Sequence, residues 1–197
     1  SRDEIDRGSV IIRSHGVVPQ VIEDAQARGL SVVDATCPYI KKVHKAASNL
    51  VHEGYDLIIV GESGHPEVEG IVGHAEGKAH VVASPKDLDG LTLGKRVGVV
   101  VQTTQTAANL SAVVAALAPL VSELRVVNTI CAATSERQRA AASLASEADI
   151  MIVVGGKNSG NTRRLAQICH VACPKTHHIE DAAELDRSWF DGARLIG

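Results

Sequence analysis

Residues 30–50, LSVVDATCPYIKKVHKAASNL, and residues 124–144, LRVVNTICAATSERQRAAASL, are two copies of one pattern. Aligned at an offset of 94, they are identical at seven of 21 positions. The matched pairs are Leu30/Leu124, Val32/Val126, Val33/Val127, Cys37/Cys131, Ala46/Ala140, Ala47/Ala141 and Leu50/Leu144. Each copy is typical of a β-branched strand, a turn that carries cysteine, and an Ala-rich helix. The sequence therefore predicts a fold built from repeated strand–helix units.

The repeat extends to both sides of this pattern. On the carboxyl side, residues 59–67, IVGESGHPE, align with residues 153–161, VVGGKNSGN, at the same offset. On the amino side, residues 11–16, IIRSHG, align with residues 99–104, VVVQTT, at an offset of 88. The matched polar pairs are His65 with Ser159, Glu67 with Asn161 and His15 with Thr103. A third copy of the unit starts near the end and stops at LIG, residues 195–197, inside the strand equivalent to VGVVVQTT. We therefore expect the sequence to be a fragment.

Short apolar runs alternate with helical stretches along the chain. Runs such as LIIV at 57–60 and IMIVV at 150–154 are continuously apolar, as strands of a parallel sheet covered on both faces require. Residues 41–53, 107–117 and 136–147 are rich in Ala, Leu, Lys and Glu and are expected to be helices. This alternation predicts an α/β protein with a parallel sheet.

Composition excludes several classes of function. The 197 residues are 45% hydrophobic, and the net charge of −3 offers no basic surface for nucleic acid. The only aromatic residues are Tyr39, Tyr55, Trp189 and Phe190, too few to stack bases. No apolar run is long enough to span a membrane, and the charged start SRDEIDRG lacks the apolar region of a signal peptide. Because four cysteines are too few for a disulfide scaffold, we expect a cytoplasmic protein.

The polar loops that the repeat matches all follow strands. Ligands of parallel sheets bind outside the carboxyl ends of the strands, so these loops are the candidate site. They are Ser14–Gly16, Cys37–Pro38, Gly64–Glu67, Gln102–Thr104, Cys131 and Asn158–Asn161. Related domains around a pseudo-symmetry axis would bring the equivalent loops together.

Cysteine has several interpretations here. Cys37 and Cys131 could be buried small hydrophobic residues, a disulfide, or ligands of a metal or iron–sulfur cluster. Both are expected at strand-to-helix turns, where backbone N–H groups favour a thiolate. Cys169 and Cys173 are four residues apart and have no counterpart in the other copy. We interpret them as buried residues on one face of a helix.

The other polar loops suggest anion binding and proton transfer, although solvated loop side chains would give the same pattern. An imidazole and loop N–H groups at His65 could hold a phosphate, and Glu67 could pass a proton. Residues 155–161, GGKNSGN, resemble a phosphate-binding loop, but neither GxGxxG nor GxxxxGK[ST] is present. His15 could bind an anion or belong to a capped turn. Gln102, Thr103 and Thr104 could donate hydrogen bonds to a substrate hydroxyl, although Thr104 or Thr106 could cap a helix instead. We interpret Lys41, Lys42, His44 and Lys45 as a solvated helix face.

Five motifs, taken in order, carry a family resemblance: DATCPYIKKVH, GHPEVEG, VVQTTQT, NTICAATSERQ and VVGGKNSGNTRRL. Together they resemble hydroxymethylbutenyl diphosphate reductases, the last enzymes of the non-mevalonate isoprenoid pathway, across essentially the whole chain. The resemblance implies a [4Fe-4S] oxidoreductase that removes the hydroxyl of 4-hydroxy-3-methylbut-2-enyl diphosphate. The products are isopentenyl and dimethylallyl diphosphate, and a ferredoxin or flavodoxin supplies two electrons.

The resemblance also implies an arrangement of domains. The family fold has three αβα domains about a pseudo-threefold axis, of which two copies would be largely present here. The expected segments are residues 1–37 as the tail of the first domain, 38–123 as the second, and 124–197 as a truncated third. The family's N-terminal segment, with its first cluster cysteine, and the segment after LIG are absent from this sequence.

The same resemblance assigns roles to individual residues. Cys37 and Cys131 match two of three cluster ligands, and Glu67 and Thr103 match the acid that delivers a proton and the threonine near the substrate hydroxyl. Residues that match diphosphate ligands are His15, His65, Ser159 and Asn161, with Gly160 standing where the family often has a second serine. Two other hypotheses remain open: a diphosphate-binding α/β module without redox activity, and a purely structural fragment.

Overall fold

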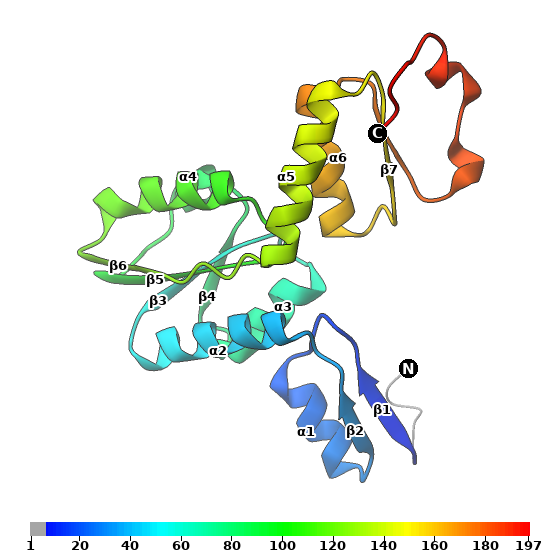
Figure 1. Ribbon diagram of the computed structural model, residues 1–197. Helices are drawn as coiled ribbons and strands as arrows, with labels where there is room; N and C mark the ends of the chain where they lie inside the picture. The colour runs from blue at the N-terminus through cyan, green and yellow to red at the C-terminus, as the bar shows by residue number, and fades with distance from the viewer. Residues whose placement is uncertain (1–6) are drawn as a thin grey trace. The chain divides into compact units, whose positions relative to one another are not determined.

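The computed structural model describes residues 7–197, which divide into a first unit that ends at Thr129 and a second unit, Ile130–Gly197 (Figure 1). Residues 1–6, the start of the expected segment 1–37, lie outside the described residues. The strands are β1 (Ser9–Ile12), β2 (Ser31–Asp34), β3 (Asp56–Val60), β4 (Ala79–Val82), β5 (Arg96–Val101), β6 (Glu123–Val126), β7 (Met151–Val154) and β8 (Thr176–Ile179). The α-helices are α1 (Pro19–Ala27), α2 (Pro38–His52), α3 (Pro66–His74), α4 (Ala107–Leu117), α5 (Ala132–Glu147) and α6 (Gly160–Ala172). Short 3-10 helices are η2 (Pro85–Leu88), η3 (Ala118–Leu120), η4 (Ala182–Glu184) and η5 (Arg187–Phe190).

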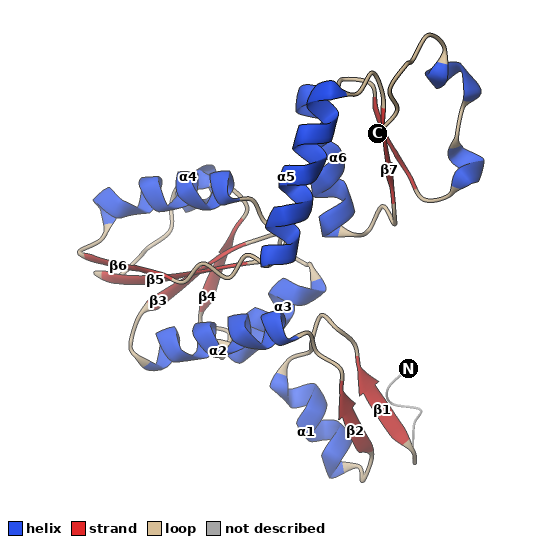
Figure 2. Cartoon of the chain, in the orientation of Figure 1, coloured by secondary structure: helices blue, strands red, loops and turns tan. Residues whose placement is uncertain are grey.

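A four-stranded parallel sheet forms the centre of the first unit, in the order β4-β3-β5-β6. Figure 2 shows α2 and α3 on one face of this sheet and α4 on the other. Covering both faces explains why the central strands are continuously apolar: residues 57–60 of β3 are fully buried, as are four of the six residues of β5. A smaller sheet, in which β1 and β2 pair in parallel, precedes α2 in the chain.

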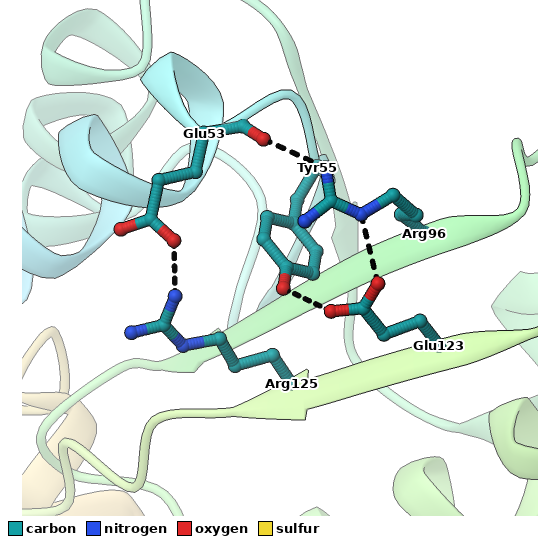
Figure 3. Close-up of polar contacts among 5 residues, drawn as sticks. All are labelled: Glu53, Tyr55, Arg96, Glu123 and Arg125. Atoms are coloured by element: carbon teal, nitrogen blue, oxygen red, sulfur yellow. Dashed lines mark hydrogen bonds and ion pairs between the residues drawn. The ribbon is translucent and has the colours of Figure 1, made fainter.

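The amino ends of the central strands are tied together by a polar network on the sheet edge opposite the candidate site (Figure 3). Arg96, at the start of β5, donates to the carboxylate of Glu123 over 2.8 Å and to the carbonyl of Glu53 over 2.9 Å. The buried Tyr55 donates its hydroxyl to Glu123, and Arg125 pairs with Glu53. The Arg96 guanidinium also lies 4.2 Å from the centre of the Tyr55 ring. This network anchors three neighbouring strands at one end.

The second unit also combines parallel strands with helices. Strands β7 and β8 pair in parallel, and Ile150 forms a further parallel bridge with Ile196. The backbone N–H of Gly197 donates to the carbonyl of Ile150 over 2.9 Å, which places residues 195–197 beside β7. Helices α5 and α6 pack against each other beside this sheet (Figure 1).

The predicted fold class is confirmed, since the molecule is an α/β protein with small parallel sheets. Helix α4 spans the predicted residues 107–117, and α5 begins four residues before the predicted position 136. Helices α1 and α3 were not predicted.

Candidate functional site

The central pair of the candidate site joins two loops at the carboxyl edge of the sheet. Glu67 lies in the first turn of α3, which follows β3, and Thr103 follows β5. One carboxylate oxygen of Glu67 accepts the backbone N–H of Thr103 over 2.6 Å, and the other accepts its hydroxyl over 2.9 Å. Only 2% of Glu67 and 7% of Thr103 are exposed. Burial therefore raises the pKa of the Glu67 carboxyl, and the two hydrogen bonds from Thr103 oppose this effect.

A second link lies beside this pair. Gln102 is fully buried, and its side-chain oxygen accepts the backbone N–H of Glu62 over 2.9 Å. This contact fixes the orientation of the amide and leaves its nitrogen without a partner among the described atoms. Gln102 thus holds the two loops together rather than extending toward solvent. Of the neighbouring threonines, Thr106 caps α4 by accepting the N–H of Asn109, as one of the two interpretations of this segment expects.

Two of the predicted anion ligands of the first unit lie close together. The rings of His15 and His65 are 5.9 Å apart between centroids, in an edge-to-face arrangement. His65 is the N-cap residue of α3, and its Nδ1 accepts the backbone N–H of Glu67 over 3.1 Å. A neutral His65 ring therefore carries its proton on Nε2. The structure places both imidazoles on the same loop cluster as Glu67.

The two repeat-matched cysteines occupy the same structural position. Cys37 is the N-cap residue of α2 and Cys131 is the N-cap residue of α5. Both are free thiols and are partly exposed. The expectation that both lie at strand-to-helix turns is confirmed.

The predicted ligands of the second unit surround the start of α6. Ser159 is its N-cap residue and accepts the backbone N–H of Thr162 over 3.3 Å. Gly160 is buried as the first helical residue. The side-chain oxygen of Asn161 is buried without a hydrogen-bond partner among the described atoms. Ser159 therefore stands in its unit where His65 stands in the first, as the repeat alignment predicts.

Two further interpretations from the sequence have clear outcomes. Cys169 and Cys173 are 0% and 4% exposed in the core of the second unit, so their interpretation as buried residues is confirmed. The interpretation of His44 as part of a solvated face is wrong: Lys41, Lys42 and Lys45 are exposed, but His44 is buried. The signal was present, because His44 lies on the buried stripe of α2 formed by Ile40, Val43, Ala47 and Leu50.

Among residues 7–197, no three or more His, Cys, Asp or Glu side chains are grouped so that they could hold a metal ion. Across the same described residues, no helix is long and apolar enough to cross a membrane.

Fold and site together define a repetitive α/β protein that carries Cys, His and Glu at the carboxyl ends of parallel strands. More narrowly, the chain belongs to the LytB protein family, whose model matches residues 2–197. The 4-hydroxy-3-methylbut-2-enyl diphosphate reductase of Geobacter sulfurreducens is 52% identical over 98% of this chain and 68% of its own length. The protein of the same name from Citrifermentans bemidjiense is 50% identical, over 96% of this chain and 67% of its own length. These relatives are oxidoreductases, and the chain spans about two thirds of their length.

Solved structures agree with this assignment. One of them is a reductase described as the terminal enzyme of the non-mevalonate pathway, and its sequence is 47% identical. The two structures superpose with a TM-score of 0.66 over 99% of this chain and 71% of the other chain. The reductase from Plasmodium falciparum is 29% identical with a TM-score of 0.92, over 98% of this chain and 62% of its own.

Proposed function

We propose that this chain forms the larger part of a 4-hydroxy-3-methylbut-2-enyl diphosphate reductase. The reaction would replace the substrate hydroxyl by hydrogen, consuming two electrons and two protons and releasing water, to give isopentenyl and dimethylallyl diphosphate. The observation that carries the proposal is the buried Glu67–Thr103 pair, which supplies a carboxyl of raised pKa beside a hydroxyl. The roughly 50% identity to named reductases supports it.

Glu67 and Thr103 are proposed to deliver the proton to the leaving hydroxyl. A buried carboxyl with a raised pKa holds its proton to higher pH than an exposed one. The Thr103 hydroxyl, 2.9 Å from the Glu67 carboxylate, is both donor and acceptor. After rotation about its C–O bond, the hydroxyl can give its own proton to a substrate oxygen and take the proton of the Glu67 carboxyl in its place.

The imidazoles of the first unit are proposed to hold the diphosphate. With Nδ1 of His65 accepting the Glu67 N–H, the proton on Nε2 is the group that would donate to a phosphate oxygen. His15, whose ring is 5.9 Å away, would donate to the same anion. Ser159, Gly160 and Asn161 of the second unit are proposed as further ligands, through a hydroxyl, a backbone N–H and an amide.

Cys37 and Cys131 are proposed as two of three ligands of a [4Fe-4S] cluster. Their donor chemistry fits, since both are free, partly exposed thiols at helix N-termini. When bound, such a cluster supplies electrons, taken from a ferredoxin- or flavodoxin-type donor, and a Lewis-acidic iron. We propose a cytoplasmic setting, where thiols stay reduced. The proposed arrangement is a domain tail at 1–37 and repeated αβα domains at 38–123 and 124–197, about a pseudo-threefold axis.

The test uses the complete natural protein that contains this chain. Anaerobic purification, iron and sulfide analysis and turnover with reduced methyl viologen should give a cluster-bearing enzyme. Glu67→Gln should keep the cluster and lose at least about 100-fold in kcat, the usual contribution of a positioned proton donor. Glu69→Gln, two residues along α3 and exposed, is the matched control and should retain activity.

Two outcomes would contradict the proposal. If the protein takes up no cluster but binds inorganic diphosphate, it is a diphosphate-binding module without redox activity. If Glu67→Gln turns over as fast as the unchanged enzyme, the assignment of the proton donor is wrong.

A further inference from the structure

His44 is a buried residue that none of the proposed catalytic steps uses. It projects from the buried stripe of α2 and is only 6% exposed. Its ring lies between the loop that carries His15 and helix α3, which carries Glu67. Two glycines make this position available, one on each side of the ring.

Gly16 and Gly70 mark how closely the ring is enclosed. A Cβ atom on Gly16 would lie 2.7 Å from Cε1 of His44, and one on Gly70 would lie 3.2 Å from its Nε2. The same Cβ on Gly70 would lie 3.8 Å from the backbone carbonyl of His15. Loop, ring and helix are therefore in close contact at one place, one residue from His15 and one helical turn from Glu67.

His74 completes the enclosure from the end of α3. Its ring stacks on that of His44 with 4.0 Å between centroids, and it hydrogen-bonds to the backbone of Val17 in the His15 loop. His74 thus connects the His15 loop to the end of α3, and the His44 ring lies between this loop and the middle of α3. Nε2 of His44 has no hydrogen-bond partner among the described atoms, so this nitrogen contributes no polar contact and the ring acts there through its shape.

The surroundings keep the His44 ring neutral. Burial and the neighbouring His74 lower the pKa of His44 to about 4, although Asp34 acts in the opposite direction. Among residues 7–197, the other charged side chains that line the cavity beside His44 are Lys41, which pairs with Asp34 over 2.5 Å, and Lys45. A neutral spacer of constant size is therefore present at physiological pH.

We propose that His44 is a positioning residue that sets the spacing between His15 and His65 and so prepares this pair for an anionic ligand. The proposal rests on the proposed function for the identity of that ligand, a diphosphate. Residue 44 corresponds to Gln138 in the other copy of the repeat, an uncharged side chain of similar length. Removing the ring would let the His15 loop move, because His44 also lines a cavity of about 370 Å³.

The experiment measures spacing and binding separately in the 197-residue chain. NMR cross-peaks between the ring protons of His15 and His65 report their spacing, and titration calorimetry at pH 7.5 with inorganic diphosphate reports binding. His44→Ala should abolish the cross-peaks and weaken diphosphate binding at least tenfold. His44→Gln should restore binding to within about threefold. His52→Ala, an exposed histidine on the same helix, should change neither.

A second variant covers the case in which His44→Ala does not fold. Gly70→Ala favours the helix by up to about 1 kcal/mol but places a methyl group against His44, so it should weaken binding without lowering stability. Unchanged cross-peaks and affinity in Gly70→Ala, or in His44→Ala where it folds, would overturn the proposal. If the unchanged chain binds no diphosphate, the proposed anion site fails, while the cross-peaks still decide the role of His44.

Discussion

Glu67 receives two hydrogen bonds from one residue, the backbone N–H and the hydroxyl of Thr103, across the ends of two neighbouring strands. A single buried carboxyl therefore both joins two loops and holds the proton-transfer group in place. Replacing it separates these two roles, because an amide of the same shape can keep both contacts if the Thr103 hydroxyl turns to accept.

Glu67→Gln is expected to change how stability depends on pH. Because the folded-state pKa of Glu67 is raised above its ordinary value of 4.5, its contribution is fully present below 4.5 and is lost as the pH rises through the folded pKa. Glutamine at position 67 does not titrate. The free energy of unfolding of the variant should therefore increase relative to that of the unchanged chain as the pH rises. Urea unfolding between pH 4.5 and 8 measures this difference. A constant difference would show that Glu67 titrates normally.

His44→Gln is expected to change the pH dependence of stability in the opposite direction. The folded-state pKa of about 4 lies below the ordinary 6.5, so the contribution of His44 is present above 6.5 and is lost as pH falls toward 4. The lost stability is at most about 3 to 4 kcal/mol, since the two pKa values differ by about 2.5 and each pKa unit corresponds to 1.36 kcal/mol. The comparison is between the Glu67→Gln variant and the double variant Glu67→Gln/His44→Gln. Because Glu67 is absent from both, its opposing titration does not affect the difference in their free energies of unfolding. Equal acid sensitivity of the two proteins would contradict the expectation.

The four cysteines should react in two classes. Cys37 and Cys131 are partly exposed, whereas Cys169 and Cys173 are buried, and burial raises the pKa of the Cys169 thiol. A thiol reagent such as Ellman's reagent should therefore label two cysteines of the native apoprotein quickly and four after unfolding in urea. Mass spectrometry of tryptic peptides identifies which two react. Fast labelling of Cys169 would contradict the packing of α5 against α6.

Tyr55→Phe is expected to lower stability without affecting the candidate site. The buried Tyr55 loses its hydrogen bond to Glu123, a change worth about 1 kcal/mol. Tyr39→Phe, at an exposed position on α2, should have no effect and serves as control. Urea midpoints measure both variants, and the His15–His65 cross-peaks should persist in each. Equal midpoints for the two variants would mean that the network in Figure 3 contributes no net stability.

How far the sequence predicts the structure differs between elements. The continuously apolar strands and the Ala-rich α4 were found at or near their observed bounds, because their local preference agrees with their burial. Helix α3, PEVEGIVGH, was missed because two glycines in nine residues oppose a helix. Tertiary packing stabilises it instead, through the fully buried Val68 and Ile71.

The sequence predicts those site residues that the internal repeat places directly after strands. It does not predict residues whose contacts depend only on how helices pack together. His15 follows β1, and His65 and Glu67 follow β3, so a rule about the carboxyl ends of parallel strands places all three in the candidate loops. The stacking of His44 on His74 depends on how α2 and α3 pack, and no local pattern encodes it. Exposed lysines on either side made His44 look solvated, although its spacing from Ile40 and Ala47 is that of the buried stripe.

The helix-capping positions have a consequence for how this molecule evolves. His65 begins α3 and Ser159 begins α6, and each accepts a backbone N–H of its own helix. Either residue could therefore change to another hydrogen-bond acceptor without loss of the helix that it starts. The fold requires only a hydrogen-bond acceptor at that position. Either an imidazole or a hydroxyl is therefore compatible with the helix.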